Sequence, residues 1–271
     1  MGIQQIREDH SLDTLDCMGQ VRLIKGKKCL DGTRIEILNK ILDWINNTDP
    51  STPPILWLHG QAGRGKSAIA HTIALQAQNL GMLGLCFCFS HVRHHEGLHM
   101  KLFTTIAHDL ADCDLHLHQI LVEVISNAHL LRDTADITEQ WKKFILEPLS
   151  QLEGPLSRNV IIVIDALDES SAEATRLDIL HILAACDAQL SSNIQIVLTS
   201  WPIMDIRQPL LTSQHVQARS LDDIKVVSVA HDITHYISTT LKELGTAFSE
   251  KDLEQLATNI RKSMRVCSTF I

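Results

Sequence analysis

The chain has 271 residues, and 24 Lys+Arg against 32 Asp+Glu give it a formal net charge of −8. Hydrophobic residues make up 45% of the chain and charged residues 21%, a composition typical of a folded globular protein that excludes general disorder. A pI near 6.0 with only 4% aromatic residues excludes the basic, base-stacking surface of an ordinary nucleic-acid-binding protein.

Cysteine usage and the amino terminus both favour a cytoplasmic protein. The seven cysteines are an odd number and include no C-x-x-C pair, which is typical of a reducing compartment. The amino terminus lacks the apolar stretch of a signal peptide, and Ile6 stands where myristoylation needs Ser or Thr. The longest apolar run, residues 80–89, is half a membrane span. We therefore expect no membrane and no nucleic acid among the partners.

The first 50 residues lead into the main domain. Residues 1–28 lack clear periodicity, and we interpret them as a poorly structured, solvated lead-in; a phosphate-binding arm is the alternative for their basic end, residues 22–28. Within a linker segment, residues 29–50, apolar residues recur at helical spacing and predict a helix from residue 35 to 45. A Pro-rich breaker at residues 49–54 ends it.

After the breaker, short apolar runs alternate with helical patterns. Strands are predicted at residues 55–58, 85–89, 160–164, 194–198 and 215–221. Helices are predicted at residues 66–79, 103–110, 117–125, 139–149, 175–190, 232–244 and 250–260. Continuous apolar strands separated by helices indicate an α/β fold with a parallel sheet covered on both faces. We assign residues 51–246 to this domain and residues 247–271 to the start of a truncated helical region.

A phosphate-binding motif lies between the first predicted strand and the helix after it. Residues 60–67 read G-Q-A-G-R-G-K-S, a full match to G-x-x-x-x-G-K-[ST]. The glycines let backbone N–H groups point at an anion, and the helix adds its positive dipole end. Lys66 is expected to reach the β- and γ-phosphates, and the Ser67 hydroxyl to bind Mg²⁺. The predicted nucleotide-binding residues here are Gly60, Gly63, Arg64, Gly65, Lys66 and Ser67.

Three carboxylates follow the most apolar predicted strand. Asp165 ends that strand at the sheet edge where ligands bind in open α/β folds, so we predict that it holds Mg²⁺ together with Ser67. Asp168 and Glu169 come next and are candidates to orient or deprotonate an attacking water. Favourable charge at a helix N-terminus is the alternative for these two residues.

These motifs together resemble a NACHT-type P-loop NTPase of the STAND class, the signalling group that includes fungal NOD-like receptors. The residues that carry the resemblance are C-L-D-G-T-R-I-E-I-L, G-Q-A-G-R-G-K-S, F-C-F-S-H, F-T-T-I-A-H-D-L, V-I-I-V-I-D-A-L-D-E, I-V-L-T-S-W-P and D-I-T-H-Y-I. The resemblance implies a five-stranded parallel core with an extra strand between the two nucleotide strands. It also implies ATP or GTP with Mg²⁺, slow hydrolysis, and a conformational switch used in self-assembly or in binding other signalling proteins.

The chain departs from the NACHT pattern in two respects. Relatives carry T-S-R-P where this chain has Trp201 in place of the Arg, so the cation that would meet the γ-phosphate is absent. Relatives also continue into further helical and repeat regions. We therefore expect this chain to be a truncated or partial member of the NACHT group. The hydroxyls of Thr199 and Ser200 either sense the γ-phosphate or belong to a plain turn.

Two functions therefore stay open. The first is a nucleotide-binding switch with weak Mg²⁺-dependent NTPase activity, and the alternative is a nucleotide-bound interaction scaffold that does not hydrolyse. A small-molecule phosphotransferase is a less favoured third hypothesis, because the sequence shows no pattern that indicates a pocket for a second substrate. The histidines at positions 91, 94, 95 and 99 are interpreted as a polar loop, and Cys86 and Cys88 as core residues on one face of a strand.

Overall fold

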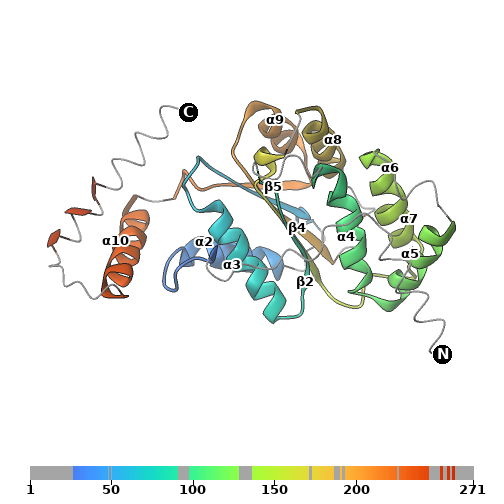
Figure 1. Cartoon of the computed structure of the whole chain (residues 1–271), viewed down its shortest axis with the longest axis horizontal. Coiled ribbons are helices and arrows are strands. Elements are labelled where there is room, and N and C mark those ends of the chain that lie inside the picture. The colour runs from blue at the N-terminus through green and yellow to red at the C-terminus, as the bar shows by residue number, and fades with distance from the viewer. Residues whose placement is uncertain are drawn as a thin grey trace.

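The computed structural model describes residues 27–47, 49, 51–90, 98–127, 136–170, 173–185, 190, 193–224 and 226–243, with helical pieces at 251–252, 255–256 and 258–259. Figure 1 shows the parallel strands at the centre, helices on both sides of them, and α10 beyond α2 and α3. Residues 1–26 of the predicted lead-in lie outside the described residues, as do residues 250, 253–254, 257 and 260 of the predicted helix at 250–260.

The strands are β1 (Ile55–His59), β2 (Leu83–Cys88), β3 (Val160–Asp165), β4 (Ile194–Ser200) and β5 (Val216–Ser220). The helices before β3 are α2 (Ile35–Ile45), α3 (Lys66–Asn79), η3 (Leu98–Lys101), α4 (Leu102–Ala111), α5 (Leu115–Asn127), α6 (Ile137–Trp141), η4 (Lys142–Leu146) and α7 (Glu147–Ser150). Those after β3 are η5 (Leu167–Glu169), α8 (Glu173–Ala184), α9 (Met204–Thr212) and α10 (Val226–Glu243).

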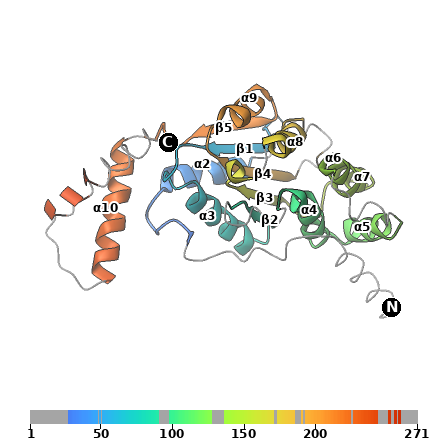
Figure 2. The ribbon, with the colours of Figure 1, turned by 45° about the horizontal axis from the view of Figure 1, so that its top comes forward.

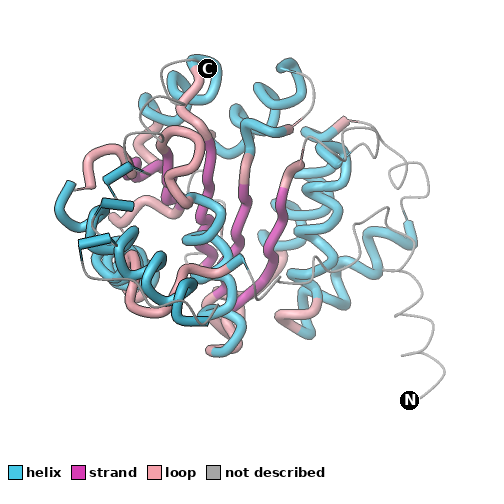
Figure 3. The backbone as a smooth tube through the Cα atoms, turned by 60° about the vertical axis from the view of Figure 1, so that its left-hand side comes forward, coloured by secondary structure: helices cyan, strands magenta, loops and turns pink. Residues whose placement is uncertain are grey.

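The five strands form one parallel sheet in the order β2-β3-β4-β1-β5. Figure 3 shows them side by side between the helices. Strand β4 separates β1 from β3, which confirms the extra strand expected between the two motif-bearing strands. Because all strands run the same way, the loops after β1, β3 and β4 leave the sheet at one edge.

Both faces of the central strands β1, β3 and β4 are buried, which explains why these strands are largely apolar rather than alternating. The edge strand β5 has the sequence V-Q-A-R-S and is only partly buried. Along β1, Ile55 and Trp57 pack into one hydrophobic cluster, while Leu56 and Leu58 pack into the other. Helices α2 and α3 cover the second face, and α4 to α9 cover the first (Figure 2). The chain is therefore a three-layer α/β fold of the P-loop type, as predicted.

Three predicted helices have different bounds. The pattern at residues 139–149 predicts one helix, but it is α6, a π-helical turn η4 and α7; Pro148 has no N–H for the carbonyl four residues earlier, which breaks the α-helical ladder there. Helix α8 ends at Ala184 rather than at residue 190. Helix α10 begins at Val226, before the predicted residue 232.

Two further details differ from the sequence pattern. The sequence gives no clear signal for α9, which carries Pro209 inside it and buries only Ile206 and Leu210. In α2, Ile35 belongs to the predicted apolar face but is 56% exposed. It is the first residue of the helix, and the buried face of α2 begins at Ile37.

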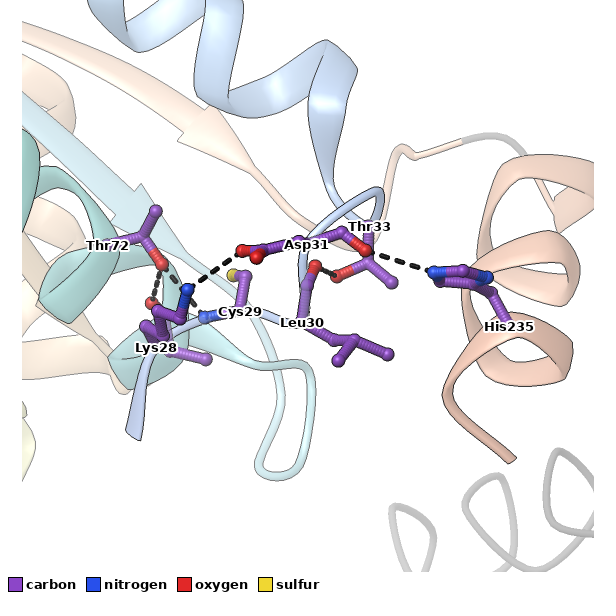
Figure 4. Close-up of polar contacts among 8 residues, drawn as sticks. Lys28, Cys29, Leu30, Asp31, Thr33, Thr72 and His235 are labelled. Atoms are coloured by element: carbon purple, nitrogen blue, oxygen red, sulfur yellow. Dashed lines mark hydrogen bonds and ion pairs between the residues drawn. The ribbon is translucent and has the colours of Figure 1, made fainter. Parts of the chain in front are cut away.

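Residues 28–33 tie α3 to α10 (Figure 4). The backbone N–H of Cys29 donates to Thr72 Oγ1 of α3 at 2.9 Å, and His235 Nε2 of α10 donates to the Asp31 carbonyl at 3.0 Å. This segment places the residue that follows it, Arg34, beside the loop between β1 and α3.

Candidate functional site

The loop between β1 and α3 has the backbone shape of a phosphate-binding loop. Gly63 and Gly65 have φ of 74° and 85°, in the left-handed region that glycine adopts without steric cost. Gly65 is the N-cap residue of α3, so the loop leads directly into the positive end of a 14-residue helix. The loop backbone and the helix start can together surround an anion.

Lys66 closes this loop from the side. Its Nζ donates to the carbonyls of Gly60 at 2.7 Å and Gln61 at 3.0 Å. Burial lowers the pKa of Lys66, while nearby carboxylates oppose this effect. The carboxylates close enough to act on the ammonium are those of Asp168, Asp165, Asp222 and Glu169. The predicted lysine and the three predicted acidic residues thus lie in one electrostatic neighbourhood.

Asp165 ends β3 as a buried carboxylate, with only 4% of its surface exposed. The hydroxyl of Thr199, on the neighbouring strand β4, donates to Asp165 Oδ1 at 2.5 Å and accepts from the Ala166 N–H at 3.0 Å. Ala166 adopts a left-handed conformation, with φ of 59°, which turns the chain sharply after the strand. These bonds fix the direction of the carboxylate.

Asp168 and Glu169 lie on the short helix η5, and both are half-buried. Asp168 Oδ1 accepts a hydrogen bond from the backbone N–H of Trp201 at 2.9 Å. Asp168 therefore links the turn after β3 to the turn after β4. The adjacent hydroxyl of Ser200 is fully buried and accepts from Trp57 Nε1 at 2.8 Å.

Two arginines brace the phosphate loop from outside. Arg34 Nη2 donates to the Arg64 carbonyl at 3.0 Å, and its Nε lies 3.6 Å from Asp232 Oδ2 of α10. The Arg64 guanidinium points at Asp222, with Nε to Oδ1 at 2.8 Å. The predicted site includes Arg64 but assigns no role to Arg34; its place in the C-L-D-G-T-R segment was the available signal.

A cavity of about 320 Å³ has Arg34 in its wall, the residue that also donates to the Arg64 carbonyl of the loop. Its walls come from the start of α2, the end of β5 and the start of α10, including Lys40, Ser220 and Asp232. Polar and apolar side chains both line it, as is usual for ligand-binding pockets.

A second group of side chains lies directly behind the loop. His71 of α3, Cys88 of β2 and Asp165 each offer a ligand atom, and these atoms all lie within 4.8 Å of one another. Interaction with Cys88 raises the pKa of His71, whereas burial opposes this effect. The hydrogen bond from Cys86 lowers the pKa of the Cys88 thiol.

Cys86 and Cys88 both pack in the second hydrophobic cluster, as predicted, but this interpretation does not foresee that Cys88 meets His71 and Asp165. One signal was available in the sequence: His71 follows Ser67 by one helical turn. The pairing of Cys88 with Asp165 is visible only in the strand order. The side chains of the predicted histidine-rich loop, residues 91–99, lie outside the described residues.

The donor atoms near the loop suit a magnesium nucleotide. Ser67 supplies a hydroxyl in the first turn of α3, and Asp165 a carboxylate held by Thr199. Hard oxygen donors of this kind, used one or two at a time, are what Mg²⁺ takes from proteins when phosphates complete its shell.

No helix among the described residues has both the length and the apolar character to cross a bilayer.

Comparisons with known proteins identify the family of the chain. No curated protein matches it significantly. The sequence model described as Nephrocystin 3, N-terminal, matches residues 32–201, a range that includes the phosphate loop, Asp165 and Trp201. Because this match covers more than half of the 271 residues, the chain belongs to the Nephrocystin 3, N-terminal family.

Proposed function

We propose that the chain is a nucleotide-binding switch module that takes ATP or GTP with Mg²⁺ and hydrolyses it slowly. The observation that carries this proposal is the position of Lys66. Its ammonium is held against the carbonyls of Gly60 and Gln61 and lies within electrostatic reach of the acidic residues after β3. A cation held beside a glycine loop and opposite carboxylates suits a bound triphosphate and its metal.

Each residue has a distinct role in this proposal. The loop backbone from Gly60 to Gly65 surrounds the phosphates, and Lys66 meets the β- and γ-phosphates. Ser67 and Asp165 hold Mg²⁺, which when bound neutralises charge on the phosphates. Asp168 or Glu169 orients the attacking water.

The cavity beside the loop is our proposed site for the base and ribose. Its wall residue Arg34 also contacts the Arg64 carbonyl, so a base in the cavity and phosphates in the loop would share one support. Titration with ATP and GTP separately, against a Ser228→Trp variant that fills the cavity wall, tests this assignment. We expect the variant to lose affinity for the preferred nucleotide and to keep its affinity for inorganic triphosphate.

Fluorescent-nucleotide titration of the full chain tests binding itself. Lys66→Ala is expected to weaken affinity at least about 100-fold, because a charge-assisted contact to phosphate is lost from a buried site. Lys143→Ala is the matched control, since Lys143 of η4 pairs with Glu147 and belongs neither to the loop nor to the cavity wall. Equal affinity of Lys66→Ala and wild type would reject the proposal.

A nucleotide-bound scaffold without hydrolysis is the second candidate, and the contact between Asp168 and Trp201 favours it. Asp168 Oδ1 is already bonded to the Trp201 N–H, and the Trp201 side chain brings no positive charge to the γ-phosphate. Phosphate-release assays separate the two candidates. Turnover that falls in both Asp168→Asn and Glu169→Gln supports the switch, whereas wild-type turnover at the background rate, raised by Trp201→Arg, supports the scaffold.

We further propose that this module signals in the manner of fungal NOD-like receptors, through nucleotide-dependent assembly with its own copies or with other signalling proteins. The resemblance of D-A-L-D-E and the phosphate loop to NACHT proteins supports this reading. Light scattering with ADP and with a non-hydrolysable triphosphate tests it. We expect a larger mass with the triphosphate in wild type and no change in Lys66→Ala.

A further inference from the structure

Three side chains behind the phosphate loop have ligand chemistry that a magnesium nucleotide does not use. His71 and Asp165 are 2% and 4% exposed, and Cys88 is half-buried at the end of β2. Their ligand atoms lie within 4.8 Å of one another, although they come from α3, β2 and β3. The proposed nucleotide site uses Asp165 but gives no role to His71 or Cys88.

The histidine ring is oriented as a metal ligand would be. His71 Nδ1 lies 2.9 Å from the carbonyl oxygen of Ser67, and a carbonyl can only accept, so Nδ1 carries the hydrogen. In the neutral ring this leaves the lone pair on Nε2, at the far side from Ser67. Metal-bound histidines commonly donate their other N–H to a backbone carbonyl in this way.

The Asp165 carboxylate is also oriented by a hydrogen bond from a neighbouring group. Thr199 Oγ1 donates to Asp165 Oδ1 at 2.5 Å, which leaves the second oxygen available as a ligand. Hydrogen-bonded carboxylates beside ligating histidines are a regular feature of protein metal sites. Two of the three candidate ligands are therefore fixed by bonds to the phosphate-loop helix and to β4.

The set of nitrogen, sulfur and oxygen donors selects the class of ion. Zn²⁺ accepts imidazole, thiolate and carboxylate at about 2.0–2.3 Å, whereas Mg²⁺ takes oxygen ligands. Ligand atoms within 4.8 Å of one another need only small side-chain rotations to reach one ion of that size. Cys88 is only half-buried, so the three donors are not fully closed off from solvent.

We propose that His71, Cys88 and Asp165 form a binding site for a thiophilic divalent cation, Zn²⁺ in particular. A second consequence rests on the proposed nucleotide function: because Asp165 cannot serve both ions, Zn²⁺ at this site competes with the magnesium nucleotide. The site would thus make nucleotide binding sensitive to zinc.

Cobalt titration of the full, untagged, reduced protein tests the site without any nucleotide. Co²⁺ is the probe because its bond to a thiolate gives a charge-transfer absorption band. We expect one equivalent of Co²⁺ to bind with this band and Zn²⁺ to abolish it. Cys88→Ser should lose the band, and the matched control Cys113→Ser, at a buried thiol near the end of α4, should keep it. No band in wild type, or an equal band in Cys88→Ser, would overturn the site.

A second variant distinguishes the loss of a metal ligand from a loss of folding. In His71→Asn the amide can still donate to the Ser67 carbonyl, but the Nε2 ligand is gone, and we expect Co²⁺ affinity to fall at least about tenfold. Thermal melts of the metal-free proteins establish that each variant folds. Zn²⁺ should raise the melting temperature of wild type and not that of His71→Asn; an equal rise in both would reject His71 as a ligand.

Competition measurements then test the link to the nucleotide. With Zn²⁺ at ten times its Kd, the apparent Kd for a fluorescent nucleotide should rise about tenfold in wild type and stay unchanged in Cys88→Ser at the same zinc concentration. Unchanged affinity in wild type would overturn the competition. A cobalt band in a protein that binds no nucleotide would sink the proposed function and leave the metal site standing; nucleotide binding without a band would do the reverse.

Discussion

The hydroxyl of Thr199 lies between Asp165 and the backbone of Ala166: it donates to the Asp165 carboxylate at 2.5 Å and accepts from the Ala166 N–H at 3.0 Å. Thr199 is fully buried, so water cannot replace either bond. One side chain on β4 thus holds both the acidic residue that ends β3 and the left-handed turn that follows it. This arrangement depends on β4 lying between β1 and β3.

Thr199→Val should destabilise the protein more than its small change in shape implies. The variant leaves the Asp165 oxygen and the Ala166 N–H without their partner, at a cost of about 2–3 kcal/mol in the free energy of unfolding. Urea denaturation of the metal-free protein measures this. Thr212→Val is the control, because Thr212 is exposed and bonds only within its own helix; an equal loss in both variants would contradict the role of Thr199.

Gly65→Ala should lower stability through backbone strain alone. Its φ of 85° is unfavourable for alanine, yet a β-carbon there would meet nothing closer than Arg34 Nη2 at 3.8 Å, an ordinary contact. We expect a loss of about 1–2 kcal/mol in the free energy of unfolding. Gly154→Ala, at a glycine with open space and no left-handed φ, should cost far less in the same denaturation series.

Arg34 and Asp232 should show strong coupling in a double-mutant cycle. Their side chains are only 16% and 13% exposed, and Asp232 also accepts from the Arg34 backbone N–H at 3.3 Å. Either alanine variant leaves one poorly hydrated charge, so we expect a coupling of about 1–3 kcal/mol. Lys40 and Glu36 form an exposed reference pair, for which about 0.3–0.5 kcal/mol is typical. Similar coupling in both pairs would show that α10 gains nothing specific from Arg34.

His59 should make stability depend on pH below neutrality. Burial lowers its pKa from 6.5, so the folded protein keeps the ring neutral while the unfolded chain binds a proton. The unfolded state then binds more protons, and stability falls as pH drops through 6.5. His59→Phe retains a ring beside Trp57 and cannot titrate. Chemical denaturation at pH 7.5 and pH 5.5 should give a smaller difference for the variant; an equal difference would assign the pH dependence to other groups.

The parallel sheet could be predicted because its central strands are buried on both faces. Residues 160–164 are apolar without interruption, and they form β3 with every position buried. Where packing or proline overrides local preference, the prediction was less accurate. The segment at 139–149 has a helical pattern, but Pro148 interrupts the α-helix there. Helix α9 carries Pro209 and buries only two residues, so it has no regular helical signal.

The local sequence was enough to predict a glycine-rich loop at residues 60–67, because its turns depend on Gly63 and Gly65 and on the helix that follows them. Tertiary structure alone decided which distant residues meet this loop. Arg34 reaches it through a turn tied to α3 and α10. Thr199 and Cys88 reach Asp165 because β4 and β2 both pair with β3. Contacts within one turn or one helix can be predicted from the spacing of residues in the sequence. Contacts between residues far apart in the sequence depend on the strand order, which follows from how the whole chain buries its apolar faces.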